Sequence, residues 1–202
     1  MRRTLIFASL LIVSFAAPAA DGDEALFGLR WGMSPSDVKA VGVTLTKDKA
    51  ERNLETYRTT SLPKNISDSE GYSLIFANGK LVKLWSVSRN IEGDPSGSSG
   101  KERFETIRSS LTQKYGTPTI NRQTVGNKLY DEYDEFYQCL AYKGCGVWVA
   151  LYETKDKTVS IQLKGLRRGT GYIDITAEAT PQWDRALEIY NANKNKSDSD
   201  AL

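Results

Sequence analysis

The stretch that most constrains the fold lies at residues 72–89, YSLIFANGKLVKLWSVSR. Two apolar runs rich in strand-forming residues flank Asn78-Gly79, the dipeptide most typical of a two-residue hairpin turn. Both central residues of a type I′ turn need a positive φ, which Gly adopts freely and Asn tolerates. We therefore predict a β-hairpin centred on Asn78-Gly79. A second hairpin is predicted at residues 147–164, with its turn at Lys155-Asp156.

The N-terminus has the layout of a secretory signal peptide. Arg2 and Arg3 are followed by an apolar run at residues 5–16 and by Ala17-Pro18-Ala19, which fits a cleavage site. The apolar run is too short for a permanent membrane span, and a buried N-terminal helix is the alternative. We expect residues 1–19 to be removed. The protein is then periplasmic or secreted, with no transmembrane segment after signal removal.

Composition excludes several classes of function. The chain has 27 Lys and Arg against 25 Asp and Glu, and Arg2 and Arg3 belong to the signal, so the mature charge is balanced. A neutral chain argues against nonspecific nucleic-acid binding, which needs a basic surface. The chain has no histidine, which excludes Ser-His-Asp and Cys-His catalysis and His-ligated metals. We expect a protein that is not an enzyme and needs no cofactor.

The sequence has two cysteines, Cys139 and Cys145. In an exported protein a close pair is most simply a disulfide. Two thiols without histidine cannot complete a four-ligand zinc site, and a redox role would favour the C-x-x-C spacing. We therefore predict a structural disulfide.

One helix with clear boundaries is predicted before each hairpin. The first begins with Ser34 as the N-cap, Pro35 in the first turn and Asp37 near the positive end of the helix dipole, and it ends near Gly42. The second is predicted at residues 101–115, where apolar side chains repeat at helical spacing.

Each half of the chain thus contains a helix, a strand and a hairpin, since strand candidates lie at residues 54–62 and 129–139. This order suggests an internal duplication, and chance coincidence of common elements is the alternative. The predicted fold is α+β: two α-β-β-β units form antiparallel sheet with helices on one face, plus a C-terminal helix.

The expected organisation follows from these elements and from changes in composition. It comprises a first α-β-β-β unit at 20–91, a flexible linker at 92–100, a second unit with an added strand and helix at 101–192, and a disordered tail at 193–202.

This element order resembles small exported α/β folds such as the BamE-like outer-membrane assembly modules. The tandem arrangement is similar to that of the β-lactamase-inhibitor protein, whose paired units bind an enzyme across a sheet surface. The resemblance covers most of the mature chain and is architectural, since no diagnostic motif matches residue by residue. That inhibitor fold carries a disulfide in each repeat, whereas only the second half here has cysteines. No site residue is carried over.

The hairpins also predict which residues face outward. In the second hairpin, one face is apolar and is expected under the helices; it holds Trp148, Ala150, Tyr152, Val159, Ile161 and Leu163. Matching the first hairpin to it leaves Tyr72, Phe76, Lys83 and Trp85 on the outward face. An aromatic patch on an open sheet is a candidate interaction surface. Cover by a loop, the last helix or the other unit is the alternative, and a one-residue slip in register would exchange the faces.

A second candidate is the acidic and aromatic stretch at residues 130–137, YDEYDEFY. Asp131, Tyr133 and Asp134 could meet a basic cleft on a partner, with aromatics as anchors and acids for steering. The structural alternative is an edge strand kept from aggregating by charge. Calcium binding lacks the EF-hand spacing, and nothing places two carboxylates across a cleft for glycosidase chemistry.

The sequence therefore favours an exported, non-enzymatic protein that binds or inhibits another exported or envelope protein through a sheet face. The alternative is a structural or assembly accessory of the bacterial cell envelope. The sequence does not determine the oligomeric state.

Overall fold

The computed structural model describes residues 24–126 and 129–200. The predicted signal peptide at 1–19 lies outside these residues. In chain order the elements are α1 (Pro35–Ala40), β1 (Thr46–Glu51), β2 (Leu54–Thr59), β3 (Ser69–Ala77), β4 (Lys80–Ser88), α2 (Ser98–Tyr115), β5 (Ile120–Thr124), α3 (Phe136–Ala141), β6 (Val147–Glu153), β7 (Lys157–Arg167), β8 (Thr170–Ala179) and α4 (Thr180–Asp200).

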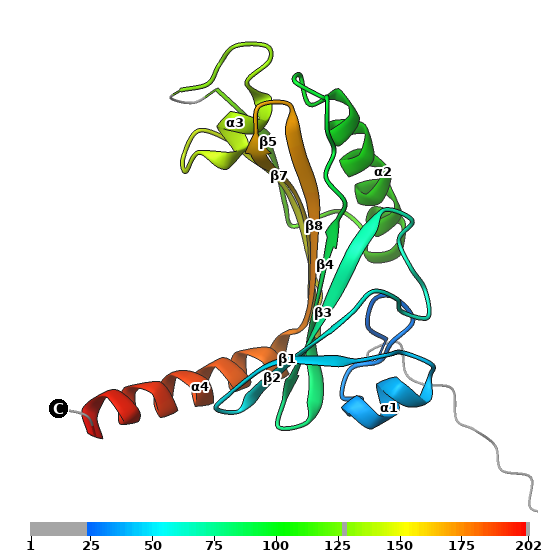
Figure 1. The fold of residues 1–202 in the computed structure, drawn as a ribbon, viewed down its shortest axis with the longest axis vertical. Helices are drawn as coiled ribbons and strands as arrows, with labels where there is room; N and C mark the ends of the chain where they lie inside the picture. Colours follow the sequence, from blue (N-terminus) through cyan, green and yellow to red (C-terminus); the bar gives the residue numbers. More distant parts are fainter. Residues whose placement is uncertain (1–23, 127–128, 201–202) are drawn as a thin grey trace, which may run out of the picture.

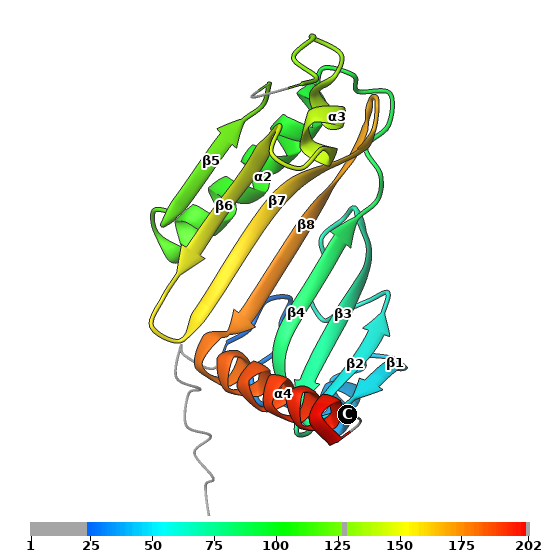
Figure 2. The ribbon, with the colours of Figure 1, turned by 90° about the vertical axis from the view of Figure 1, so that its left-hand side faces the viewer.

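The strands form one antiparallel sheet in the order β1-β2-β3-β4-β8-β7-β6-β5. Figure 1 shows this sheet edge-on, with α1 and α2 on one side and α4 on the other. Figure 2 shows α4 in front of the sheet and α2 behind it. We call the side under α1 and α2 the inner face, and the side that carries α4 the outer face. The predicted α+β class, with an antiparallel sheet and a C-terminal helix, is confirmed.

The strand order has an internal symmetry. Reading inward from either edge, the first half contributes β1-β2-β3-β4 and the second half contributes β5-β6-β7-β8, and the halves join where β4 pairs with β8. Each half thus contains a helix followed by four strands, with α3 between β5 and β6 in the second half. In the first half this is one strand more than the predicted α-β-β-β unit. The partner of the Asn78-Gly79 hairpin in this symmetry is the β7–β8 hairpin, and not the hairpin at Lys155-Asp156.

The predicted strand at residues 129–139 is not formed. The edge strand of the second half is β5, and the acidic and aromatic segment is instead a loop that leads into α3. Tyr137 explains this difference, because its side chain is fully buried and donates a hydrogen bond from its hydroxyl to Asp94 Oδ2 at 2.8 Å. Gly165 and Gly171 pair across β7 and β8 where Tyr137 packs, and a Cβ on Gly171 would lie 2.1 Å from the Tyr137 ring.

Two segments expected to be flexible are ordered parts of the structure. In the predicted linker at 92–100, Asp94 is buried and its carboxylate also accepts a hydrogen bond from the Gly100 backbone N–H at 3.0 Å. The helix α2 already begins within this stretch. Residues 193–200 of the predicted disordered tail belong to α4, which continues to Asp200.

The predicted start of α1 and the predicted ends of α1 and α2 agree with the structure. Ser34 and Asp37 form a reciprocal capping box at the start of α1, with Pro35 in its first turn. Gly42 and Gly116 follow α1 and α2 with φ of 88° and 83°, conformations that favour glycine.

One main core fills the space between the inner face and the helices. Its largest fully buried side chains include Phe76, Leu81 and Leu84 from the first half and Tyr152 and Ile161 from the second. A smaller cluster lies on the outer face, where α4 packs its Ala186 and Trp183 on Leu54, Ala77 and Val82. The α4 helix therefore covers one end of the outer face of the first half. Among the described helices, none combines the length and the apolar character that crossing a bilayer would require.

Candidate protein-binding face

The register of the first hairpin determines which side chains reach the outer face. Asn78-Gly79 forms the predicted two-residue turn, with Ala77 opposite Lys80. The pairing then skips one residue, because Phe76 faces Leu81 whereas Ile75 faces Lys83. Val82 is the extra residue of a β-bulge. From Lys83 onward every β4 residue is displaced by one position from the regular register that the sequence predicted.

The bulge overturns half of the predicted outward patch. Tyr72 is 3% exposed and Phe76 is fully buried, and both belong to the main core together with Leu84. Tyr72 packs edge-to-face on Phe27, and its hydroxyl oxygen accepts a hydrogen bond from the Ile66 backbone N–H at 3.1 Å. Tyr72 and Phe76 are therefore core residues and are withdrawn from the binding surface.

Trp85 and Lys83 do lie on the outer face. Trp85 is 40% exposed, and its indole Nε1–H donates to Asp174 Oδ1 at 2.7 Å, which fixes the plane of the ring. Lys83 is more enclosed: its ammonium is 2.6 Å from Glu178 Oε1 and lies 4.6 Å from the centre of the Trp183 ring of α4. Lys83 therefore marks the boundary of the covered end, and Trp85 belongs to the open part.

A hollow of about 450 Å³ opens beside Trp85, at the end of β2, β3 and β4 that α4 leaves uncovered. Arg58, Ser73 and Trp85 form one cross-strand row, since Arg58 pairs with Ser73 and Ser73 pairs with Trp85. Gly71 lies two residues before Ser73 on the same side of β3. The hollow exists because the two large side chains of this row are separated by a serine, with a glycine next to it.

Arg58, Gly71 and Ser73 are not among the residues predicted from the sequence. A usable signal was present, because in residues 71–74 small residues alternate with the large Tyr72 and Leu74. That alternation places Gly71 and Ser73 on the exposed face and Tyr72 in the core. The match to the second hairpin predicted the opposite faces, because it assumed a regular register and residues 81–84 contain no sign of the bulge.

Asp131, Tyr133 and Asp134 lie in the loop before α3. Tyr133 is 81% exposed, and Asp134 forms an ion pair with Arg168 in the β7–β8 turn. Figure 1 places α3 at the end of the molecule opposite α4. The structure therefore does not bring the acidic residues together with Trp85, and the two candidates are separate regions.

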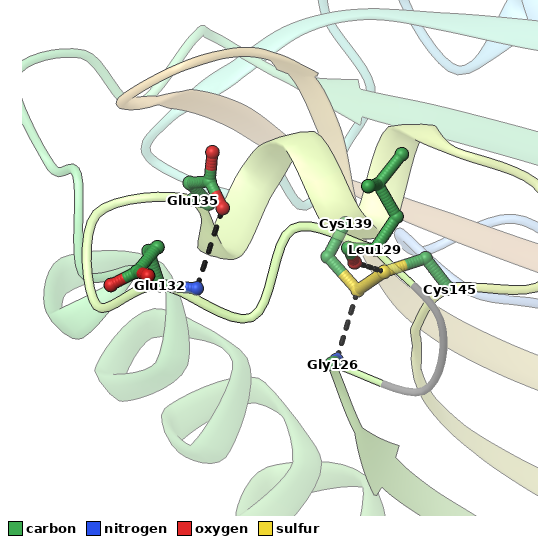
Figure 3. The surroundings of a disulfide bond; sticks show 6 residues. All are labelled: Gly126, Leu129, Glu132, Glu135, Cys139 and Cys145. Atoms are coloured by element: carbon green, nitrogen blue, oxygen red, sulfur yellow. Dashed lines mark hydrogen bonds between the residues drawn. A yellow bond between two sulfur atoms is a disulfide. The ribbon is translucent and has the colours of Figure 1, made fainter.

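The predicted pair Cys139–Cys145 lies at disulfide distance, with the Cα atoms 5.1 Å apart. Figure 3 shows this bond between α3 and the loop that follows it, with Gly126 and Leu129 beside the two sulfur atoms. The Gly126 backbone N–H donates to Cys139 Sγ at 3.1 Å, and Cys145 Sγ is in close contact with the Leu129 carbonyl oxygen. Both cysteines are fully buried, so the bond has a structural position.

The shifted pKa values belong to structural contacts. Hydrogen bonds from Lys49 and Tyr190 lower the pKa of Glu51 to about 2, and the Tyr190 contact joins α4 to β1. Burial, followed by the hydrogen bond to Asp94, raises the pKa of Tyr137 well above its usual range. Within residues 24–126 and 129–200, no three carboxylates or thiols are grouped closely enough to hold a metal ion.

The geometry of the outer face is suited to recognition by shape: a fixed, exposed indole stands beside a hollow, and α4 bounds it at one end. No protein-family model, curated protein or solved structure matches the chain.

Proposed function

We propose that the chain is an exported, non-enzymatic protein that binds or inhibits another protein through the open part of its outer sheet face. The observation that supports this most is Trp85. A large aromatic side chain is 40% exposed although α4 covers apolar residues on the same face. Tryptophan is among the residues most enriched at the energetic centre of interfaces.

The fixed orientation of Trp85 also favours binding. Because Asp174 accepts the indole proton and lies 3.5 Å from Lys164 Nζ through its other oxygen, the ring is held before a partner arrives. A side chain that is already ordered loses less conformational entropy on association. Export is supported by the paired cysteines, which persist in oxidising compartments.

The test is affinity capture from envelope extract with three immobilised baits: the wild-type protein, Trp85→Ala and Val41→Ala. Val41 is 50% exposed at the end of α1, so it is a matched control for loss of exposed apolar surface on the other side. We expect one partner that binds wild type and Val41→Ala equally and binds Trp85→Ala more weakly by about 1–3 kcal/mol. Equal capture by all three baits would contradict the proposal. The partner's identity then separates an inhibited enzyme from a component of envelope assembly.

A further inference from the structure

The hollow beside Trp85 has two different walls. One wall is the fixed indole of Trp85 on β4, and the other is Arg58 on β2, whose side chain is 68% exposed. Arg58 Nε lies 3.0 Å from Asp48 Oδ2 of β1, on the side away from Ser73. This ion pair draws the arginine toward the edge of the sheet and so keeps the space above Ser73 open.

The spacing of the strands leaves room for one flat group above Ser73. Neighbouring strands lie about 4.8 Å apart, so the Cα atoms of Arg58 and Trp85 are separated by roughly 10 Å across β3. A planar ring in van der Waals contact with a wall on each side needs about 7–8 Å between those walls. An aliphatic side chain could enter the space but would use neither the face of the indole nor the guanidinium.

The chemistry of the walls favours an aromatic ring. Aromatic pairs gain from stacking beyond the area that they bury, and a guanidinium over a ring face is attracted by the ring's quadrupole. Arg58 is paired with Asp48 and Trp85 is uncharged, so neither wall carries an unbalanced charge. The other charged residue of the lining is Glu70, which disfavours an anionic ligand. Thr44, Thr46 and Thr60 also line the hollow. A threonine hydroxyl can form a hydrogen bond with the polar edge of a tyrosine or tryptophan side chain.

We infer that the hollow is a subsite for a single aromatic side chain of the partner, which inserts above Ser73 between Trp85 and Arg58. This inference rests on the proposed function and names the group that the outer face recognises. Trp85 is the stacking wall, Arg58 the cation–π wall, and the small residues Gly71 and Ser73 the floor.

The test needs no knowledge of the partner. ¹⁵N-labelled protein is titrated with N-acetyl-tryptophanamide and N-acetyl-tyrosinamide, and N-acetyl-leucinamide is the aliphatic control. The reporters are the Gly71 backbone N–H and the Trp85 indole N–H. We expect saturable shifts at millimolar concentrations with both aromatic amides, and at least fivefold weaker binding of the leucine compound. Equal binding of all three would overturn the inference.

Matched substitutions locate the site. Ser73→Phe fills the floor and should weaken binding of the tryptophan compound at least tenfold, whereas Ser160→Phe makes the same change on β7 and should leave it unchanged. Arg58→Ala removes one wall and should weaken binding about threefold through loss of the cation–π contact. Thermal melts confirm that each variant is folded. Unchanged binding to Ser73→Phe would overturn the subsite, whereas the proposed function fails only if Trp85→Ala still captures the partner normally.

Discussion

The two predicted hairpins, β3–β4 and β6–β7, have turns of the same length and yet behave differently. In β6–β7 the pairing is regular, and Ala150, Tyr152, Val159 and Ile161 are all buried on the inner face as predicted. In β3–β4 the bulge at Val82 breaks the alternation, and buried residues occur on both faces. When one face of a hairpin is polar, as it is here at Thr158, Ser160 and Gln162, the sequence alone shows which face is buried.

The outer face of β3–β4 is apolar at one end because α4 covers it. Ala77 and Val82 contact Ala186, and Asn53 donates a side-chain hydrogen bond to the Ala186 carbonyl oxygen at 3.0 Å. A strand pair with cover on both faces has no polar pattern to reveal its register. Four experiments would break or sharpen this comparison.

Deleting one residue from each hairpin should have the largest and most unequal effect. Without Val159, the following β7 residues move by one position, so that Ile161 and Leu163 turn outward and Ser160 and Gln162 turn inward. We expect no cooperative thermal unfolding. Without Val82, the bulge disappears and Ile75 still faces Lys83, so only the contact of Val82 with α4 is lost, at about 2 kcal/mol. If deletion of Val82 also abolished folding, the account of the bulge would be wrong.

Two aromatic truncations on adjacent strands should separate core from surface. Tyr72→Ala empties a buried site and should lower the free energy of unfolding by about 3–4 kcal/mol. Trp85→Ala should cost about 1 kcal/mol, since it removes a half-exposed ring and one hydrogen bond to Asp174. Urea unfolding with fixed m-value measures both. Comparable losses would place Trp85 in a core and remove it from the binding face.

Reduction of the disulfide should destabilise only the second half of the chain. The bond closes a short loop, with a sequence separation of 6, so the chain-entropy contribution is about 2 kcal/mol. We expect hydrogen exchange to increase in α3 and its flanking loops under reducing conditions, while β3 and β4 keep their protection. Mass spectrometry without reduction should show the two-hydrogen deficit in oxidised protein. Uniform loss of protection would mean that the bond supports the whole sheet.

The smallest of the four expected effects is that of acid on the contact between β1 and α4. The pKa of Glu51 is about 2 in the folded protein and 4.5 ordinarily, so folding favours the ionised form. Its stabilising effect is therefore complete above pH 4.5 and is lost as the pH falls toward 2. Glu51→Gln should melt slightly below wild type at pH 6, and the two should converge near pH 2. A constant difference would exclude this linkage.

The sequence by itself determined the features that depend on local chemistry. The turn at Asn78-Gly79 needs residues that tolerate positive φ, the start of α1 needs the Ser34–Asp37 capping box, and the inner face of β6–β7 follows from strict alternation. Each of these is decided within a few residues. Two of the four residues predicted on the outward face of the first hairpin, Lys83 and Trp85, do lie on the outer face, although the regular register assumed there was wrong.

Only the tertiary structure decided which parts of the chain meet. Tyr137 turns the segment at 129–139 from a strand into a loop and helix because Asp94, more than forty residues earlier, accepts its proton and two paired glycines leave it room. Val82, the bulged residue, is covered by α4, which lies about one hundred residues later in the sequence. The hollow at Trp85 requires three strands to be aligned in one row. Burial against a distant segment is a free-energy term that no local pattern contains, because it exists only once the partner surface is in place.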